Sequence, residues 1–255
     1  MDQDYTIMEG YELPSKGLIY DKSVPANFEL RCLTGSDELK LLASTTTQFK
    51  LLAEVIESCL IDKPAIHVYD MALGDYEYLL QRLRVVTYGP EYKMWVKCPH
   101  CGKLSETVAD LDQLTVIEFN EERQQEFNEL RTVTLPDSGD IVRLNFKTPR
   151  MLDTIASRAK EMSRRFKDAE LDFNTLVDLQ MTIAEVNGKA LDPLKSETYI
   201  KKLSGRDMFT IINRETKLNN FIGVDTTLVV DCSECGGEVT TRFQYGPEFL
   251  KPTTV

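Results

Sequence analysis

No uninterrupted apolar stretch of about 18 residues, the length at which a helix spans a bilayer, occurs in the chain. The first residues, MDQDYT, also lack the positive charge and the apolar run of a signal peptide. We therefore expect a protein without a membrane span that is made and kept in a reducing cytosol. In such a compartment, six cysteines are more typical of metal ligands or core thiols than of disulfides.

Catalytic motifs are missing as well. The chain has only two histidines, His67 and His100, and neither lies beside a nucleophile motif. It contains no glycine-rich phosphate loop, no H-E-x-x-H and no G-x-S-x-G. Its many carboxylates are more typical of a solvated acidic surface than of a catalytic pair. The sequence therefore predicts a protein that is not an enzyme and has no small-molecule substrate.

The chain has fewer basic than acidic residues. The chain has 30 Lys+Arg against 41 Asp+Glu, and its formal net charge of -11 repels phosphate backbones and anionic lipids. The one basic concentration, residues 158–167, is diluted by nearby acidic residues and is more typical of a solvated or protein-docking helix face. The charge balance therefore disfavours nucleic acid as a partner.

The patterns along the chain divide it into four segments. Residues 1–18 are polar, have no helical period and predict an extended arm ending in a turn. Residues 1–12 of this arm carry too little apolar surface to fold alone, so we expect either a docking arm that becomes ordered only against a partner or a frayed terminus that contacts nothing. An N-terminal αβ segment (19–112), a mainly helical insertion (113–222) and a C-terminal β segment (223–255) follow. Together they predict an α+β fold.

Periodicity in residues 19–112 predicts helices and strands in alternation. Thr47 and Asp75 are the expected N-caps of two helices, the second of which should break at residues 85–89. Cys32 is expected to be a small core residue of the first strand. Strands are predicted at residues 27–33, 93–97 and 104–108.

The insertion is expected to start with two strands and to continue with three helices. Thr148 and Pro149 provide an N-cap and a first-turn proline for the first of these helices. The other two helices are predicted at residues 173–185 and 204–219. Strands are predicted at residues 130–135 and 141–146 and, after the insertion, at 226–230 and 239–243.

Two Cys-x-x-Cys pairs lie at the tips of predicted hairpins. Cys98 and Cys101 are one pair, Cys232 and Cys235 are the other, and a glycine follows each pair. A tight turn of this kind aims backbone N–H groups at both sulfurs, and the glycine supplies the positive φ. Four thiolates make a closed tetrahedral zinc site without an open position for catalysis. The pattern favours one structural zinc ion per chain.

Thiol exchange and disulfide formation are the alternatives. The sequence Cys98-Pro-His-Cys101 also occurs in strong thiol oxidants, where a helix N-terminus lowers the thiol pKa. Here a strand precedes the motif and an alternating segment follows it, so that helix is missing. Redox chemistry at the first pair would also leave Cys232 and Cys235 unexplained. His100 lies between two thiols, where it would strain the ring as a ligand, and is expected to be exposed.

The spacing between the two pairs is unusually long. Cys101 and Cys232 are separated by 130 residues (102–231), against about 15 to 20 in an ordinary zinc ribbon. The sequence therefore predicts a split zinc ribbon whose metal clamps both ends of a long insertion.

Four strings in this chain together resemble the baseplate hub proteins of T-even-like contractile-tailed bacteriophages. They are Leu13-Pro-Ser-Lys-Gly17, Thr87-Tyr-Gly89 leading to Cys98-Pro-His-Cys-Gly102, Leu203-Ser-Gly-Arg-Asp207, and Cys232-Ser-Glu-Cys-Gly236. The resemblance runs over nearly the whole chain. It implies a virion or assembly protein of the tail baseplate that acts without catalysis. Such a protein contacts other tail subunits in a hetero-oligomeric assembly, with assembly in the host cytoplasm and a place in the virion tail baseplate.

Two other functions fit parts of the sequence. A zinc ribbon beside the basic residues 158–167 would suit a nucleic-acid-binding regulator, which should show a strongly salt-dependent affinity for DNA. An assembly chaperone would share every sequence feature of a baseplate subunit but would be absent from purified virions. Mass spectrometry of intact particles separates the assembly chaperone from the baseplate subunit.

Overall fold

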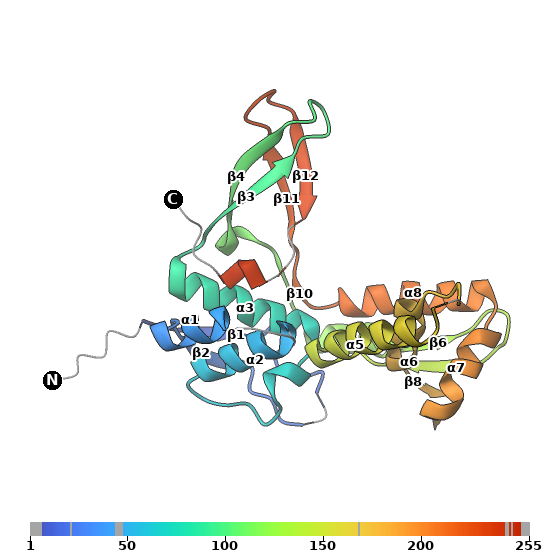
Figure 1. The fold of residues 1–255 in the computed structure, drawn as a ribbon. Helices are drawn as coiled ribbons and strands as arrows, with labels where there is room; N and C mark the ends of the chain where they lie inside the picture. Colours follow the sequence, from blue (N-terminus) through green and yellow to red (C-terminus); the bar gives the residue numbers. More distant parts are fainter. Residues whose placement is uncertain are drawn as a thin grey trace.

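The computed structural model describes residues 7–20, 22–43, 48–167, 169–242, 245 and 247–250. Figure 1 shows an N-terminal unit, a ribbon that projects from it, and an insertion that extends to one side. Helices and small antiparallel sheets occur together, so the predicted α+β class is confirmed. Within the described part of the chain, no helix combines the length and the apolar character needed to cross a membrane.

Three helices and a two-stranded sheet form the N-terminal unit, and α3 (Leu73–Tyr88) packs against both strands. The apolar stripe predicted after Thr47 is buried, with Val55, Ile56 and Cys59 at most 1% exposed. Thr47 itself, the expected N-cap, lies outside the described residues. The elements of this unit are β1 (Met8–Glu12), β2 (Asn27–Arg31), α1 (Gly35–Leu42), α2 (Gln48–Cys59) and α3 (Leu73–Tyr88).

The first segment of the chain is part of this unit. Strand β1 pairs antiparallel with β2, and Leu13 and Ser15, which follow it, are buried. The expectation of order only against a partner is therefore wrong for residues 8–12, because β2 supplies their backbone hydrogen bonds. Residues 1–6 lie outside the described residues. Cys32, expected in the core, follows the end of β2 and is only half-buried.

Helix α3 begins earlier and ends later than predicted. Its N-cap is Ala72, and Asp75 instead accepts hydrogen bonds from the Ser15 N–H and the Tyr20 hydroxyl. The predicted break at residues 85–89 is wrong, because residues 85 and 86 pack in the core and the helix continues through them. It ends at Tyr88, and its C-cap is Gly89, whose φ of 86° only glycine adopts easily.

Two antiparallel hairpins form the ribbon. They are β3 (Glu91–Lys97) with β4 (Leu104–Asp110), and β11 (Thr227–Asp231) with β12 (Glu238–Arg242). Both hairpins were predicted at these positions. Their inner faces meet through Val96 and Val239, with Met94 and Val230 packed alongside. In Figure 1 the ribbon stands above α3, with the hairpin tips farthest from the body.

The insertion is mainly helical but also contains a sheet. Strands β6 (Thr132–Thr134), β7 (Ile141–Leu144), β8 (Ile183–Val186) and β9 (Lys189–Ala190) pair in that order. Thr148 caps α5 and Pro149 opens it, as predicted. Helix α6 ends at Thr182, before the predicted residue 185, because β8 pairs with β7. The helices are α4 (Gln124–Arg131), α5 (Pro149–Arg165), α6 (Phe173–Thr182), α7 (Pro193–Lys202) and α8 (Gly205–Asn219).

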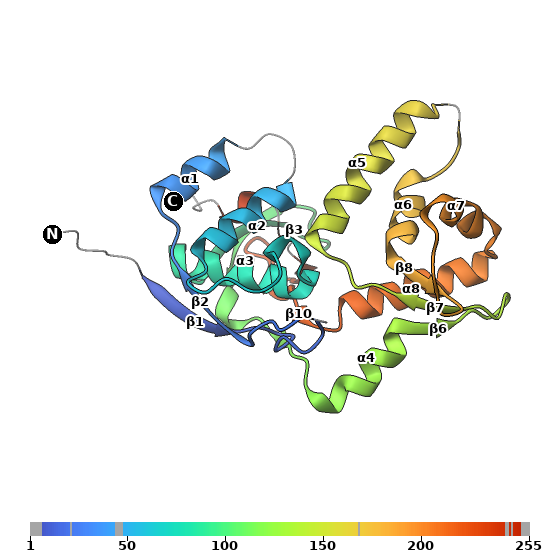
Figure 2. The same cartoon turned by 90° about the horizontal axis from the view of Figure 1, so that it is seen from below.

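The insertion is tied to the N-terminal unit in at least two places. Strand β5 (Val116–Ile117) pairs with β10 (Gly223–Val224) where the chain enters and leaves the insertion. At the second place, Asp153 of α5 accepts hydrogen bonds from the Lys50 N–H at 3.0 Å and the Tyr69 hydroxyl at 2.9 Å. Figure 2 shows α5 beginning beside α2, on the side where these contacts form.

Candidate metal centre

The four predicted cysteines meet at the tip of the ribbon. The Sγ atoms of Cys98 and Cys235 lie 3.7 Å apart and those of Cys101 and Cys232 lie 3.8 Å apart, and all four lie within 4.8 Å of one another. Four sulfurs about 2.3 Å from one zinc ion at tetrahedral corners are about 3.8 Å apart. A disulfide would require about 2.05 Å. The spacing therefore fits a shared metal ion, and all four cysteines are free thiols in the structure.

The two turns that carry the thiols have the same backbone pattern. In the first, the Cys98 N–H donates to the Lys103 carbonyl and the Gly102 N–H donates to the Cys98 carbonyl, both at 2.9 Å. In the second, the Cys232 N–H donates to the Gly237 carbonyl at 2.9 Å and the Gly236 N–H to the Cys232 carbonyl at 2.8 Å. The glycines of both turns have positive φ, 73° for Gly102 and 67° for Gly236. The sequence repeat is thus also a structural repeat.

Backbone N–H groups stabilise negative charge at the sulfurs. The His100 N–H points at the Cys98 sulfur at 3.4 Å. The pKa of Cys232 is lowered to about 6 because the N–H groups of Glu234 and Cys235 donate to its sulfur. The Gly237 N–H lowers the pKa of Cys235, but burial and the three other thiols together raise it to about 12. Four thiolate sulfurs this close to one another repel each other, and a metal cation among them offsets that repulsion. The geometry therefore suits four thiolates around one metal ion.

Burial differs between the two thiols of each pair. Cys98 and Cys232 are buried, whereas Cys101 and Cys235 are exposed at the tip. The buried pair forms the small ribbon core together with Val96 and Val239. A metal ion held here would have all four positions filled by protein, and it would join two hairpins that are distant in the sequence.

His100 lies outside the ligand set, as predicted. Its ring is exposed, and its Nε2 atom lies 2.9 Å from the carbonyl oxygen of Glu238. The ring also lies over Gly237, where an added Cβ would come within 2.7 Å of the His100 Cδ2 atom. His100 therefore joins the first turn to the second, a role that the sequence pattern did not reveal.

Other polar contacts also link the two hairpin tips. The Ser105 and Ser233 hydroxyl oxygens lie 2.9 Å apart, and the Ser233 N–H donates to the Ser105 oxygen at 3.2 Å. Lys103 forms an ion pair with Glu234 at 2.7 Å. These residue types are common in exposed turns, so nothing in the sequence marks them as partners.

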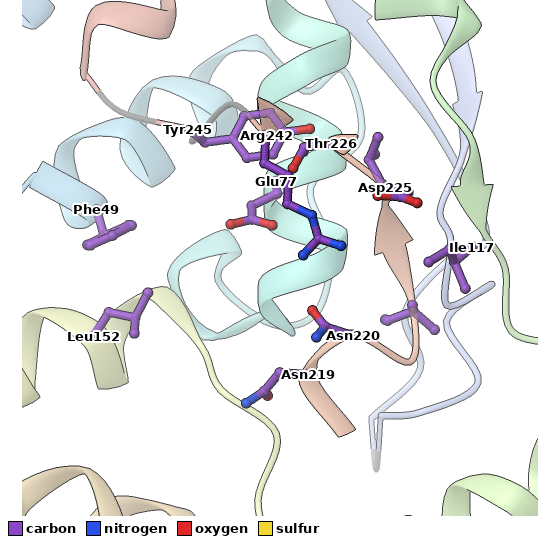
Figure 3. A pocket seen from close by; sticks show the side chains of 12 residues that line it. Phe49, Glu77, Ile117, Leu152, Asn219, Asn220, Asp225, Thr226, Arg242 and Tyr245 are labelled. Atoms are coloured by element: carbon purple, nitrogen blue, oxygen red, sulfur yellow. The ribbon is translucent and has the colours of Figure 1, made fainter. Parts of the chain in front are cut away.

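A separate cavity of about 540 Å³ lies where the ribbon, the N-terminal unit and the insertion meet. Figure 3 shows the carboxylate of Glu77 in this cavity with Arg242 near it. Arg242 donates from Nε to the Thr227 hydroxyl oxygen at 2.8 Å. His67, the other histidine, contacts Glu57 at 2.6 Å and caps a short 3-10 helix, η1 (Val68–Asp70). Among the described residues, neither place contains a nucleophile hydrogen-bonded to a general base.

Comparison with known proteins gives one match. A family model described as T4 bacteriophage base plate protein matches residues 10–251, which include both hairpins and the whole insertion. No curated protein and no solved structure matched the chain. The family supports a structural role in the tail baseplate of a phage. The chain therefore belongs to the T4 bacteriophage base plate protein family.

Proposed function

We propose that this baseplate protein is a hub subunit that acts through contacts with other tail subunits and carries one structural zinc ion per chain. Cys98, Cys101, Cys232 and Cys235 would hold the ion. The observation that carries the zinc assignment is the convergence of four sulfurs at spacings of 3.7 and 3.8 Å on two matching turns. A tetrahedral set of four thiolates selects zinc or iron, and zinc is the usual ion in ribbons of this kind.

The proposed role is structural rather than catalytic. A zinc ion with four protein ligands has no open position for water or substrate. Its effect would be mechanical, because it fixes the hairpin before the insertion to the hairpin after it. Assembly would take place in the host cytoplasm, and the subunit would remain in the tail baseplate of the virion.

Metal analysis and particle composition test this proposal. The purified chain should contain one zinc ion, and mass spectrometry should detect the chain in purified intact virions. Cys235→Ser should lose the metal, whereas Cys32→Ser, which changes a half-buried thiol outside the cluster, should retain it. A metal-free wild-type chain whose four thiols all react in the native state would refute the zinc assignment.

The two alternatives give different results. An assembly chaperone would be present during tail formation and absent from intact virions. A nucleic-acid-binding regulator would bind DNA with an affinity that falls steeply with salt. The net charge of -11 weighs against the regulator.

A further inference from the structure

The outer face of the first hairpin is defined by the strand register. Four cross-strand pairs place their side chains on the face opposite Met94 and Val96, which pack inward against the second hairpin. We call this face the Trp95 face. Its pairs are Glu91 with Asp110, Lys93 with Val108, Trp95 with Glu106, and Lys97 with Leu104.

The centre of the Trp95 face is apolar and exposed. Trp95 is 67% exposed, Leu104 64% and Val108 49%. Leu104 and Val108 are the two diagonal neighbours of Trp95 on the opposite strand, so the three side chains form one patch. Trp95 is also the single tryptophan of the chain. A contiguous exposed apolar patch marks an interaction site, and tryptophan is the residue type most enriched at binding hot spots.

The charges around the patch identify the chemistry of its partner. Lys93 forms an ion pair with Glu106 at 4.0 Å. Lys97, beside Leu104, has no side-chain ion pair or hydrogen bond to any described residue. Burying the patch would therefore leave one cation that needs a carboxylate from the partner.

We propose that the Trp95 face docks on another protein subunit of the tail that offers an apolar pocket for the indole and a carboxylate for Lys97. The proposal rests on the proposed function for the source of the partner. Figure 1 shows the ribbon standing clear of the body, and the exposed side chains of Trp95 and Leu104 leave this face open to a neighbouring subunit. The metal centre would keep the face rigid, which lowers the entropy cost of docking.

Nucleic acid and a second copy of the chain fit this face less well. Glu91, Glu106 and Asp110 lie on the same face as the two lysines and oppose phosphate binding. A second copy would bring another net charge of -11 to the contact. A different subunit that places one carboxylate opposite Lys97 avoids both the phosphate backbone and this added charge.

Binding to tails that lack this subunit tests the proposal. The probe is tails purified from a phage in which the gene for this chain is deleted, mixed with purified chain and recovered by sedimentation. Trp95→Ala should bind at least about tenfold more weakly than wild type. Phe209→Ala is the matched control, because Phe209 is an aromatic side chain 64% exposed on α8, and it should bind like wild type. Metal content and melting temperature should be the same in all three chains.

Two variants of Lys97 test whether docking requires its positive charge. Lys97→Glu should weaken binding by a similar factor, whereas Lys97→Arg should retain it because the charge is kept. Wild-type binding by both Trp95→Ala and Lys97→Glu would overturn the proposal while leaving the proposed function intact. Failure of the wild-type chain to bind the tails, together with its absence from virions, would instead overturn the proposed function. A wild-type dimer in solution that Trp95→Ala converts to a monomer would identify a second copy as the occupant and overturn the proposal.

Discussion

The backbone N–H of Ser15 donates a hydrogen bond to the carboxylate of Asp75 at 3.0 Å, across 60 residues of sequence. Both residues are fully buried. The other carboxylate oxygen of Asp75 accepts a hydrogen bond from the Tyr20 hydroxyl at 2.6 Å. The string Leu13-Pro-Ser-Lys-Gly17, which resembles the baseplate family, is therefore a buried turn fixed to the first turn of α3.

Replacing Asp75 should destabilise the N-terminal unit. Asp75→Ala leaves a buried N–H and the Tyr20 hydroxyl without an acceptor, and each unpaired group costs about 1 to 3 kcal/mol. We expect the free energy of unfolding to fall by about 2 to 5 kcal/mol in urea titrations followed by circular dichroism. Asp192→Ala, which removes only the cap of α7, should cost about 1 kcal/mol. Equal losses in the two variants would contradict a special role for Asp75.

Glu77 should make stability depend on pH. Burial raises its pKa to about 7 from an ordinary value of 4.5. Between these two pH values the unfolded chain releases the proton while the folded chain keeps it, so the free energy of unfolding falls as pH rises. The loss is about 1 to 3 kcal/mol, is complete just above pH 7, and is absent below about pH 4.5.

Variants that replace a carboxylate by an uncharged amide test whether Glu77 causes this pH dependence of stability. Glu77→Gln should be more stable than wild type at pH 8, and its advantage should disappear at pH 4. Glu122→Gln, which changes an exposed carboxylate on η3 (Glu121–Arg123), should leave the wild-type profile unchanged. Urea midpoints at pH 4, 6 and 8 provide the comparison, and parallel profiles for Glu77→Gln and wild type would rule out the mechanism.

The two hairpins and the cluster of four thiols at their tips could be predicted from sequence because their signals are local. Alternation of apolar residues marks the strands, and each Cys-x-x-Cys-Gly string specifies a turn by itself. The same holds for α5, whose Thr148 cap and Pro149 mark its start. The meeting of the two hairpins across the insertion followed from the hypothesis that their four thiols share one metal ion. Local chemistry was therefore sufficient for the site.

Positions set by tertiary packing could not be predicted in this way. Asp75 has the residue type of an N-cap, but the buried Ser15 N–H and Tyr20 hydroxyl use its carboxylate. Val85 and Val86 have strand propensity, but they pack in the core on the helical face of α3. In α6 the helix stops at Thr182 because β7 offers backbone partners to the next residues. In each case a distant segment overrides the local preference.

Gly74 should tolerate no side chain. An added Cβ would lie 2.4 Å from the Ile222 carbonyl oxygen and 3.1 Å from the Gly223 Cα atom, and both contacts are with backbone. Gly74→Ala should therefore lower the free energy of unfolding by at least about 2 kcal/mol, because α3 and β10 must move apart. Gly205→Ala is the control, since a Cβ there meets nothing within 4 Å. We expect it to change stability by less than about 1 kcal/mol, and a similarly small effect at Gly74 would contradict the close packing.

Metal removal should loosen the ribbon before the rest of the protein. Among the described residues, the buried hydrophobic cluster of the ribbon consists of Val96, Cys98, Cys232 and Val239, and two of these four are candidate ligands. Without the ion, this core buries too little apolar surface to hold two hairpins together. Helix α3 belongs to the larger core of the N-terminal unit, so its amide protons should remain protected.

Hydrogen exchange measured by mass spectrometry, with and without a chelator, tests this order of unfolding. Peptides from β3, β4, β11 and β12 should exchange at least about tenfold faster after metal loss, while peptides from α3 keep their rates. Cys235→Ser should reproduce the chelated pattern, and Cys32→Ser should reproduce the metal-bound one, because the Cys32 thiol lies outside the cluster. Unchanged exchange in all four strands after metal loss has been verified would show that the hairpins hold together without the ion, and the metal would then have no structural role in the ribbon.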